Sequence, residues 1–242
     1  MNNEQRKKRI ADVAEWMKDH QYTQLVNANG VEVWRCQKPD TIHLAFDICV
    51  TRFGMSIAGD IGSLVFRVGS SYGIDFLRHQ SDGYLYEKLE EAYRKDREFD
   101  GDGFLSQIVL AICDRIYNDL DEDLAPDWAP EEKRGAVTAD SLKDWLQEKG
   151  ALDIEDVGGF EFNELADLIN DAQELVNTGR DESIAARDLL EDAEPLMHVS
   201  DTWEWRLNKP AGAVMTRLFY VRHAASCIMA IKEAEQAQAV AK

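Results

Sequence analysis

The spacing of apolar side chains changes from a helical to an alternating pattern near residue 20. Between residues 4 and 20, apolar side chains recur at helical spacing, at Ile10, Val13, Ala14, Trp16 and Met17. This spacing is typical of an amphipathic helix. From residue 22 to residue 69, short runs rich in β-branched and aromatic residues alternate in part with polar ones. The second pattern predicts four or five antiparallel strands.

Two glycine-containing segments divide the predicted strands. Asn29-Gly30 is a strong signal for a two-residue hairpin turn. Gly59-Asp60-Ile61-Gly62 lies between two further short apolar runs. A phosphate-binding loop is the alternative interpretation of this glycine pair, but no Lys-Ser or Lys-Thr follows it and both flanks resemble strands. We therefore expect a β-hairpin turn at each place.

Helical periodicity dominates the chain after residue 75. Helices are predicted over 75–80, 84–95, 104–118, 138–149, 160–178, 182–192 and 211–237. Thr138 and Asp140 are both candidates for an N-cap, and Pro210 precedes the last helix. The pattern predicts an α+β protein, with an N-terminal helix, a small antiparallel sheet and a mainly helical acidic region. We expect the last helix to pack back on the sheet and to make one compact unit.

Negative charge is concentrated in one continuous segment of the 242-residue chain, whose net charge is −19. Residues 1–95 hold 13 acidic and 13 basic side chains, so this region is balanced. Residues 96–205 hold 31 acidic and 8 basic side chains, a net charge of −23, and residues 206–242 have a net charge of +4. A segment of this kind repels nucleic acid and anionic membranes and attracts basic surfaces. We therefore expect no direct binding of nucleic acid through the acidic region, and no membrane partner.

The acids of the predicted helix at 160–178 recur at spacings of three and four, which places them in one row on the solvent side. The row consists of Glu161, Glu164, Asp167, Asp171 and Glu174. Three interpretations of the acidic segment remain open. It is a solvated surface that maintains solubility, a docking face for a basic protein, or a surface that imitates the phosphate spacing of nucleic acid.

No local sequence motif for catalysis or metal binding is present. The chain lacks GxSxG, HExxH and tandem Cys/His patterns, and its four cysteines, without a CxxC pair, read as reduced thiols of a cytosolic protein. A partial calcium-loop match at 96–107 ends in Gln107 where a bidentate Glu is needed. We therefore expect no catalytic residue, cofactor or metal, and a non-enzymatic binding protein. The alternative is a nucleotide-signal binding protein or enzyme with a site near the Arg35 and Asp60 hairpins.

Three short landmarks lie far apart in the chain. They are Trp34-Arg35-Cys36-Gln37-Lys38-Pro39, the segment from Ile57 to Phe66 with its Gly-Asp-Ile-Gly turn, and Trp203-Glu204-Trp205 followed by the final helix. In these landmarks the chain resembles a group of uncharacterised proteins encoded by bacteriophages and prophages. The group has no function to transfer, and the resemblance implies an accessory gene on a mobile element that acts in the bacterial cytoplasm.

The phage context leads to a specific expectation about the partner. Small acidic phage proteins often block host defence by occupying a nucleic-acid-binding surface, which is an argument by association. We therefore expect an anti-defence inhibitor, of the anti-CRISPR kind, that uses its acidic face to occupy a basic host protein or nucleic-acid-handling complex.

Overall fold

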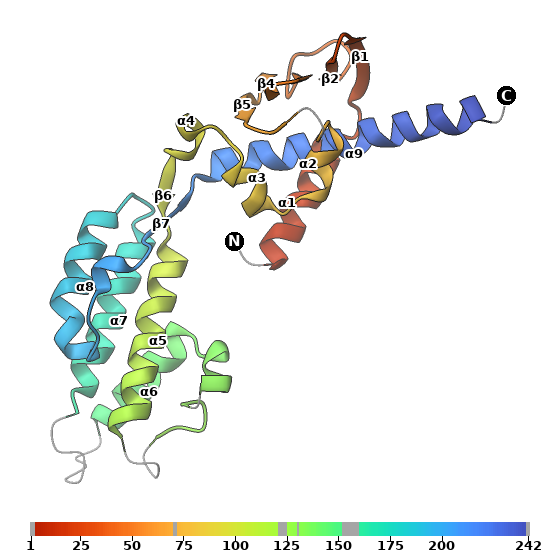
Figure 1. The fold of residues 1–242 in the computed structure, drawn as a ribbon. Coiled ribbons are helices and arrows are strands. Elements are labelled where there is room, and N and C mark those ends of the chain that lie inside the picture. The colour runs from red at the N-terminus through yellow and green to blue at the C-terminus, as the bar shows by residue number, and fades with distance from the viewer. Residues whose placement is uncertain (1–2, 70–71, 121–124, 130, 152–159, 241–242) are drawn as a thin grey trace. The chain divides into compact units, whose positions relative to one another are not determined.

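The computed structural model describes residues 3–69, 72–120, 125–129, 131–151 and 160–240 (Figure 1). It confirms the predicted α+β class, with an N-terminal helix, a five-stranded antiparallel sheet and then helices. The chain divides into two compact units, whereas the sequence led us to expect one. Unit 1 comprises residues 1–97 and 210–242, and unit 2 comprises residues 98–209.

Unit 1 is built on the five-stranded antiparallel sheet, in which the strands follow one another in the order of the sequence. The strands are β1 (Gln21–Ala28), β2 (Val31–Gln37), β3 (Phe46–Thr51), β4 (Gly54–Gly59) and β5 (Gly62–Phe66). Alternate side chains such as Trp34, Ile48, Ile57 and Leu64 are buried on one face. This one-sided burial is the cause of the alternating pattern in the sequence.

Both predicted hairpin turns are present. Asn29 and Gly30 adopt positive φ values of 53° and 74° between β1 and β2, as a two-residue hairpin turn requires. Gly59 pairs with Gly62 across the turn between β4 and β5. A glycine is needed at position 59, because a Cβ atom there would lie 2.5 Å from the Cα atom of Phe46.

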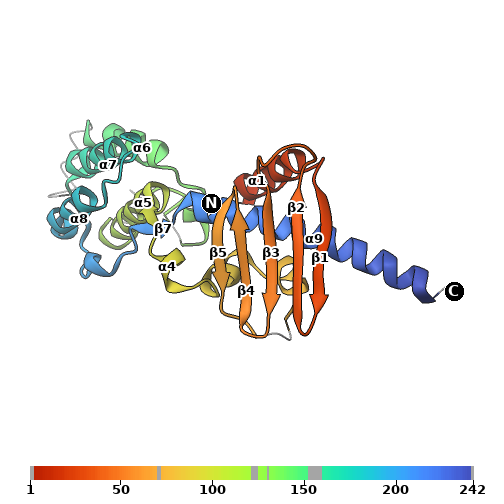
Figure 2. The same cartoon turned by 90° about the horizontal axis from the view of Figure 1, so that it is seen from above.

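The helices of unit 1 lie against one face of the sheet, except for the short helix at 91–94, which lies beside β5 (Figure 2). They are α1 (Asn3–Trp16), α2 (Asp75–His79), α3 (Asp82–Glu87), α4 (Glu91–Arg94) and α9 (Gly212–Val240). Val13, Leu77, Leu85 and Leu218 from four of them are buried in the same core as the inward side chains of the sheet. α9 crosses behind the strands and extends past β1 (Figure 2).

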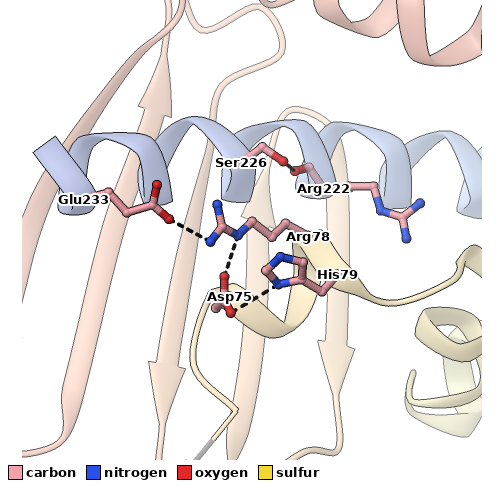
Figure 3. A network of polar contacts seen from close by, with 6 residues as sticks. All are labelled: Asp75, Arg78, His79, Arg222, Ser226 and Glu233. Atoms are coloured by element: carbon pink, nitrogen blue, oxygen red, sulfur yellow. Dashed lines mark hydrogen bonds and ion pairs between the residues drawn. The ribbon is translucent and has the colours of Figure 1, made fainter.

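Ion pairs fasten α9 to the sheet and to α2. Lys232 Nζ lies 2.8 Å from Glu32 Oε1 on β2. Arg78 lies between Asp75, at 2.5 Å, and Glu233 of α9, at 2.7 Å (Figure 3). These contacts hold α9 as far as Glu233, and the side chains at 234–239 are exposed.

The predicted helix at 84–95 is wrong in its middle. The structure has α3 and α4 there, separated by a segment that pairs with the edge of β5. Phe66 forms a bridge with Leu89, and the Glu90 N–H donates to the carbonyl of Val65. Sheet pairing therefore overrides helical periodicity at these residues.

The chain passes between the units through two short strands that pair with each other, β6 (Arg97–Phe99) and β7 (Asn208–Pro210). Unit 2 consists of α5 (Gly101–Asp119), η1 (Glu131–Ala136), α6 (Ala139–Gly150), α7 (Phe162–Asn177), α8 (Ser183–Met197) and η2 (Thr202–Glu204). α7 contacts α5, α6 and α8. Together these helices bury a second hydrophobic core, which is separate from that of unit 1.

The ends of two helices in unit 2 follow the predictions to different degrees. Thr138 is the N-cap of α6, in a capping box with Ser141, so one of the two candidate caps is confirmed. α8 continues to Met197 beyond the predicted end at residue 192, although Pro195 lies within it. It ends at His198, whose φ of 53° is left-handed and stops the helix.

Candidate functional site

The two units differ sharply in charge. Unit 2 holds 30 acidic and 9 basic side chains, a net charge of −21. Unit 1 holds 16 acidic and 18 basic side chains, a net charge of +2. The charge boundaries read from the sequence, at residues 96 and 205, fall close to the limits of unit 2. The acidic region therefore coincides with the compact helical unit 2.

The acids predicted to form a row lie on or next to α7, and all are exposed. Glu164, Asp167, Asp171 and Glu174 share one side of the helix, and none makes an ion pair with a described residue. Their opposite side is buried against the core of unit 2. Glu161 differs from the other four, because it precedes the helix and pairs with Arg115. We call Glu164, Asp167, Asp171 and Glu174 the α7 acidic row.

Neighbouring helices carry further exposed acids. On α6, Asp144 and Glu148 are exposed, and α8 exposes Asp188, Glu191 and Asp192. Contacts between α6 and α7 connect two of these helices, since Gln173 donates to Asp140 at 2.8 Å and accepts from Lys143 at 2.9 Å. The acidic surface of unit 2 thus extends over several helices.

The spacing of the α7 acidic row is wider than that of nucleic-acid phosphates. Ten residues separate Glu164 from Glu174, about 15 Å along a helix axis, so the four charges lie about 5 Å apart. A single DNA strand carries one charge per about 3.4 Å of axis, and the duplex one per about 1.7 Å. The α7 acidic row alone therefore does not reproduce the charge density of a duplex, and neighbouring helices would have to contribute.

The basic side chains of unit 2 are largely engaged within the unit. Arg115 is buried, donates to the Leu196 carbonyl and to Glu161, and lies with its guanidinium carbon 4.6 Å from the centre of the Phe160 ring. The guanidinium of Arg115 holds the pKa of Glu161 below its ordinary value, chiefly through the hydrogen bond. A cation placed in this way stabilises the bundle and leaves the outer acids uncompensated.

Four more cations of unit 2 have similar internal roles. Arg134 pairs with Asp114, and Arg187 donates to two backbone carbonyls, one of them that of Trp205 at 2.9 Å. Lys209 lies 3.3 Å from Asp100, the N-cap of α5, and Lys143 contacts Gln173. The surface potential of unit 2 is consequently dominated by carboxylates.

Arg35 and Asp60, the residues of the alternative predicted site, each bind a partner within unit 1. Arg35 forms a two-pronged pair with Asp47 on the neighbouring strand, with both contacts at 3.0 Å. Asp60 accepts the backbone N–H of Leu44 at 2.7 Å, and His43 lies 3.9 Å from it. The two residues thus have structural partners within the sheet, and neither lines the two cavities described for this chain.

A polar cluster that the sequence did not suggest lies in the core of unit 1. His20 Nε2 donates to the Leu44 carbonyl oxygen at 3.2 Å, and His223 Nε2 lies 3.6 Å from Cys227 Sγ. Burial lowers the pKa of His223 and raises the pKa of Cys36. Burial therefore favours the neutral forms of His223 and Cys36, which suits a packed core better than nucleophilic or metal chemistry. His223 and Cys227 are four residues apart on α9, but His20 and Cys36 come from distant parts of the sequence, so spacing alone does not reveal the whole cluster.

No metal-binding arrangement is found in the described ranges, where no three His, Cys, Asp or Glu side chains are placed to hold an ion. The partial calcium loop at 96–107 is replaced by β6 and the start of α5, where Asp100 accepts the N–H of Gly103. A shallow cavity of about 350 Å³ adjoins this start. Its lining mixes acids such as Asp181 with the cations Arg180 and Lys209, so it has no single charge preference.

Comparison with known proteins adds no family to this description. The chain matches no protein-family model, and it has no significant similarity to a curated protein or to a solved structure. None of the helices in the described part of the chain is long and apolar enough to cross a membrane.

Proposed function

We propose that this protein is a non-enzymatic binding protein whose acidic helical unit docks on a basic protein surface that otherwise binds nucleic acid. The observation that carries the proposal is the α7 acidic row, four exposed carboxylates on one side of a helix without an ion pair to any described residue. A fixed row of like charges that has no partner within the unit favours a partner of opposite charge.

The charge distribution supports docking through unit 2 in particular. Its net charge of −21 contrasts with +2 for unit 1, and buried or paired cations such as Arg115 leave the outer acids uncompensated. Such a surface accelerates encounter with a basic partner and repels nucleic acid itself. The resemblance to phage and prophage proteins directs the search for the partner to bacterial nucleic-acid-handling complexes, including CRISPR effectors.

The solvated-surface interpretation makes a different prediction. A surface that only maintains solubility depends on total charge, so the positions of the acids are interchangeable. A docking surface depends on which acids are present. Position dependence of binding therefore separates the two interpretations.

The full chain is first used to capture partners from a bacterial lysate. Each captured protein is then bound to labelled duplex DNA, and the release of the DNA is measured when the chain is added. Two triple variants are compared, Asp167→Asn/Asp171→Asn/Glu174→Gln on α7 and Asp188→Asn/Glu191→Gln/Asp192→Asn on α8. Each removes three charges from unit 2. We expect the α7 variant to lower the association rate about tenfold at low salt and the α8 variant to have a smaller effect.

Two results would count against the proposal. Equal weakening by both variants would assign the effect to total charge. Binding that does not respond to salt, or a captured protein that keeps its DNA, would contradict an electrostatic competition for a nucleic-acid site.

A further inference from the structure

The two edges of the sheet in unit 1 are treated differently by the fold. β5 is covered by the segment at 88–90, through the bridge between Phe66 and Leu89 and the hydrogen bond from Glu90 to Val65. β1 forms the other edge. Within the described ranges, no backbone hydrogen bond reaches β1 from any element other than β2. The outer side of β1 is therefore open to a further strand.

The composition of β1 does not protect this edge. Natural proteins blunt open edges with charged residues, proline or bulges. The eight residues Gln21–Ala28 contain no charged residue and no proline, and seven of them are exposed. A bulge between Gln24 and Val26 is the one blunting device present. Leu25 and Val26 expose 44% and 40% of their surface at this bulge. Exposed apolar surface is unfavourable in water, and a strand paired with β1 would cover part of it.

The end of α9 projects under the space next to β1. Residues 234–239 are exposed, and the helix extends past β1 in the view along which the strands are seen side by side (Figure 2). Seven residues from 234 to 240 span about 10 Å, which equals about two strand spacings. A strand added at β1 would therefore lie over the exposed end of α9.

We infer that β1 pairs antiparallel with β1 of a second copy of this chain, which joins two five-stranded sheets into one continuous sheet. Because β1 is uncharged, two copies meet there without opposing like charges. A two-fold pairing also closes the assembly, since the other edge of each sheet is already covered. A basic partner would be drawn to unit 2 rather than to this neutral edge.

The test measures the mass of the full chain by sedimentation over about a hundredfold range of concentration. We expect a reversible monomer–dimer equilibrium that strengthens with salt, because each chain carries a net charge of −19 that salt screens. Leu25→Lys and Leu25→Glu place like charges near each other across the two-fold axis. Each variant should weaken dimerisation about tenfold or more, and an equimolar mixture of the two should restore it.

The control is Phe53→Lys, which adds the same charge at a side chain that is 79% exposed in the turn between β3 and β4. It should leave dimerisation unchanged. Hydrogen exchange on the unmodified chain gives a second readout, in which β1 amides gain protection with concentration and β5 amides do not. A monomer at every concentration, a mixture of the Leu25 variants that stays monomeric, or equal weakening by Phe53→Lys would overturn the inference.

Discussion

The guanidinium of Arg115 lies inside unit 2 and donates to the carboxylate of Glu161, 46 residues further along the chain. The arginine side chain is 3% exposed and the glutamate side chain 46%. The pair joins α5 to the residue that precedes α7, and the bond to the Leu196 carbonyl adds the end of α8. One cation thus connects three helices of unit 2, whose many carboxylates repel one another.

Replacing Arg115 with methionine should destabilise unit 2 by about 2 kcal/mol, because the carbonyl of the half-buried Leu196 loses its donor while the half-exposed Glu161 can be hydrated. Urea unfolding, followed by the exchange of amides in α5 and α8, measures the loss. Arg180→Met is the matched control, since Arg180 is exposed in the turn before α8 and should change stability by less than about 0.5 kcal/mol. Equal losses for the two variants would contradict the structural role of Arg115.

Acid should weaken unit 2 partly through Glu161. Because Arg115 lowers the pKa of Glu161 in the folded state, the pair contributes stability above the ordinary pKa of 4.5, and that contribution is lost as the pH falls through the folded-state pKa. Urea midpoints between about pH 6 and pH 3 should therefore fall more steeply for the natural chain than for Glu161→Gln. Parallel curves would show that the pair does not contribute.

Gly59 should tolerate no side chain. Gly59→Ala places a Cβ atom 2.5 Å from Phe46 Cα and 2.7 Å from Phe46 Cβ, so the pairing of β4 with β3 must shift, at a cost of about 3 kcal/mol. Gly83→Ala is the control, because Gly83 lies in α3 with no atom within 4 Å of the new Cβ. It should stabilise the chain by about 0.5 kcal/mol. Thermal unfolding measures both, and a neutral Gly59→Ala would refute the predicted clash.

Three of the four thiols should differ in their rate of alkylation. Burial raises the pKa of the Cys113 thiol to about 11, and it raises that of Cys36 as well, so both should resist alkylation at pH 8. Cys49 is half-buried on the side of β3 that faces away from the helices and should react before either. Mass spectrometry of the partly alkylated native chain measures the order, and early labelling of Cys113 would contradict the buried position.

The sheet could be predicted from the sequence because one of its faces is buried and the other is not. That asymmetry appears directly as alternation around Trp34, Ile48 and Ile57, and the turn residues mark where each strand ends. The break between α3 and α4 could not be predicted, because it depends on hydrogen bonds from Glu90 to a strand more than twenty residues earlier. Local periodicity does not include such partners.

The acidic face was accessible to sequence reasoning for a similar reason. Exposed positions on α7 recur every three or four residues, and those positions hold the acids. The role of Glu161 was not accessible, since nothing near it in the sequence indicates that Arg115 is buried beside it. The division into two units could not be predicted either. The apolar helix faces of the two cores have the same periodicity, and periodicity does not indicate which helices pack against each other.

The position of α9 at the end of the chain has a consequence for biosynthesis. The ribosome completes β5 about 150 residues before it begins α9, and it makes the whole of unit 2 in between. Until α9 emerges, the apolar face of the sheet lacks the buried side chains Leu218, Ala225 and Ile228 that complete its core. The nascent chain therefore carries a sheet whose apolar face is covered only in part, by α1, α2 and α3, through most of its translation. The strongly charged unit 2, synthesised in that interval, favours the solubility of this intermediate.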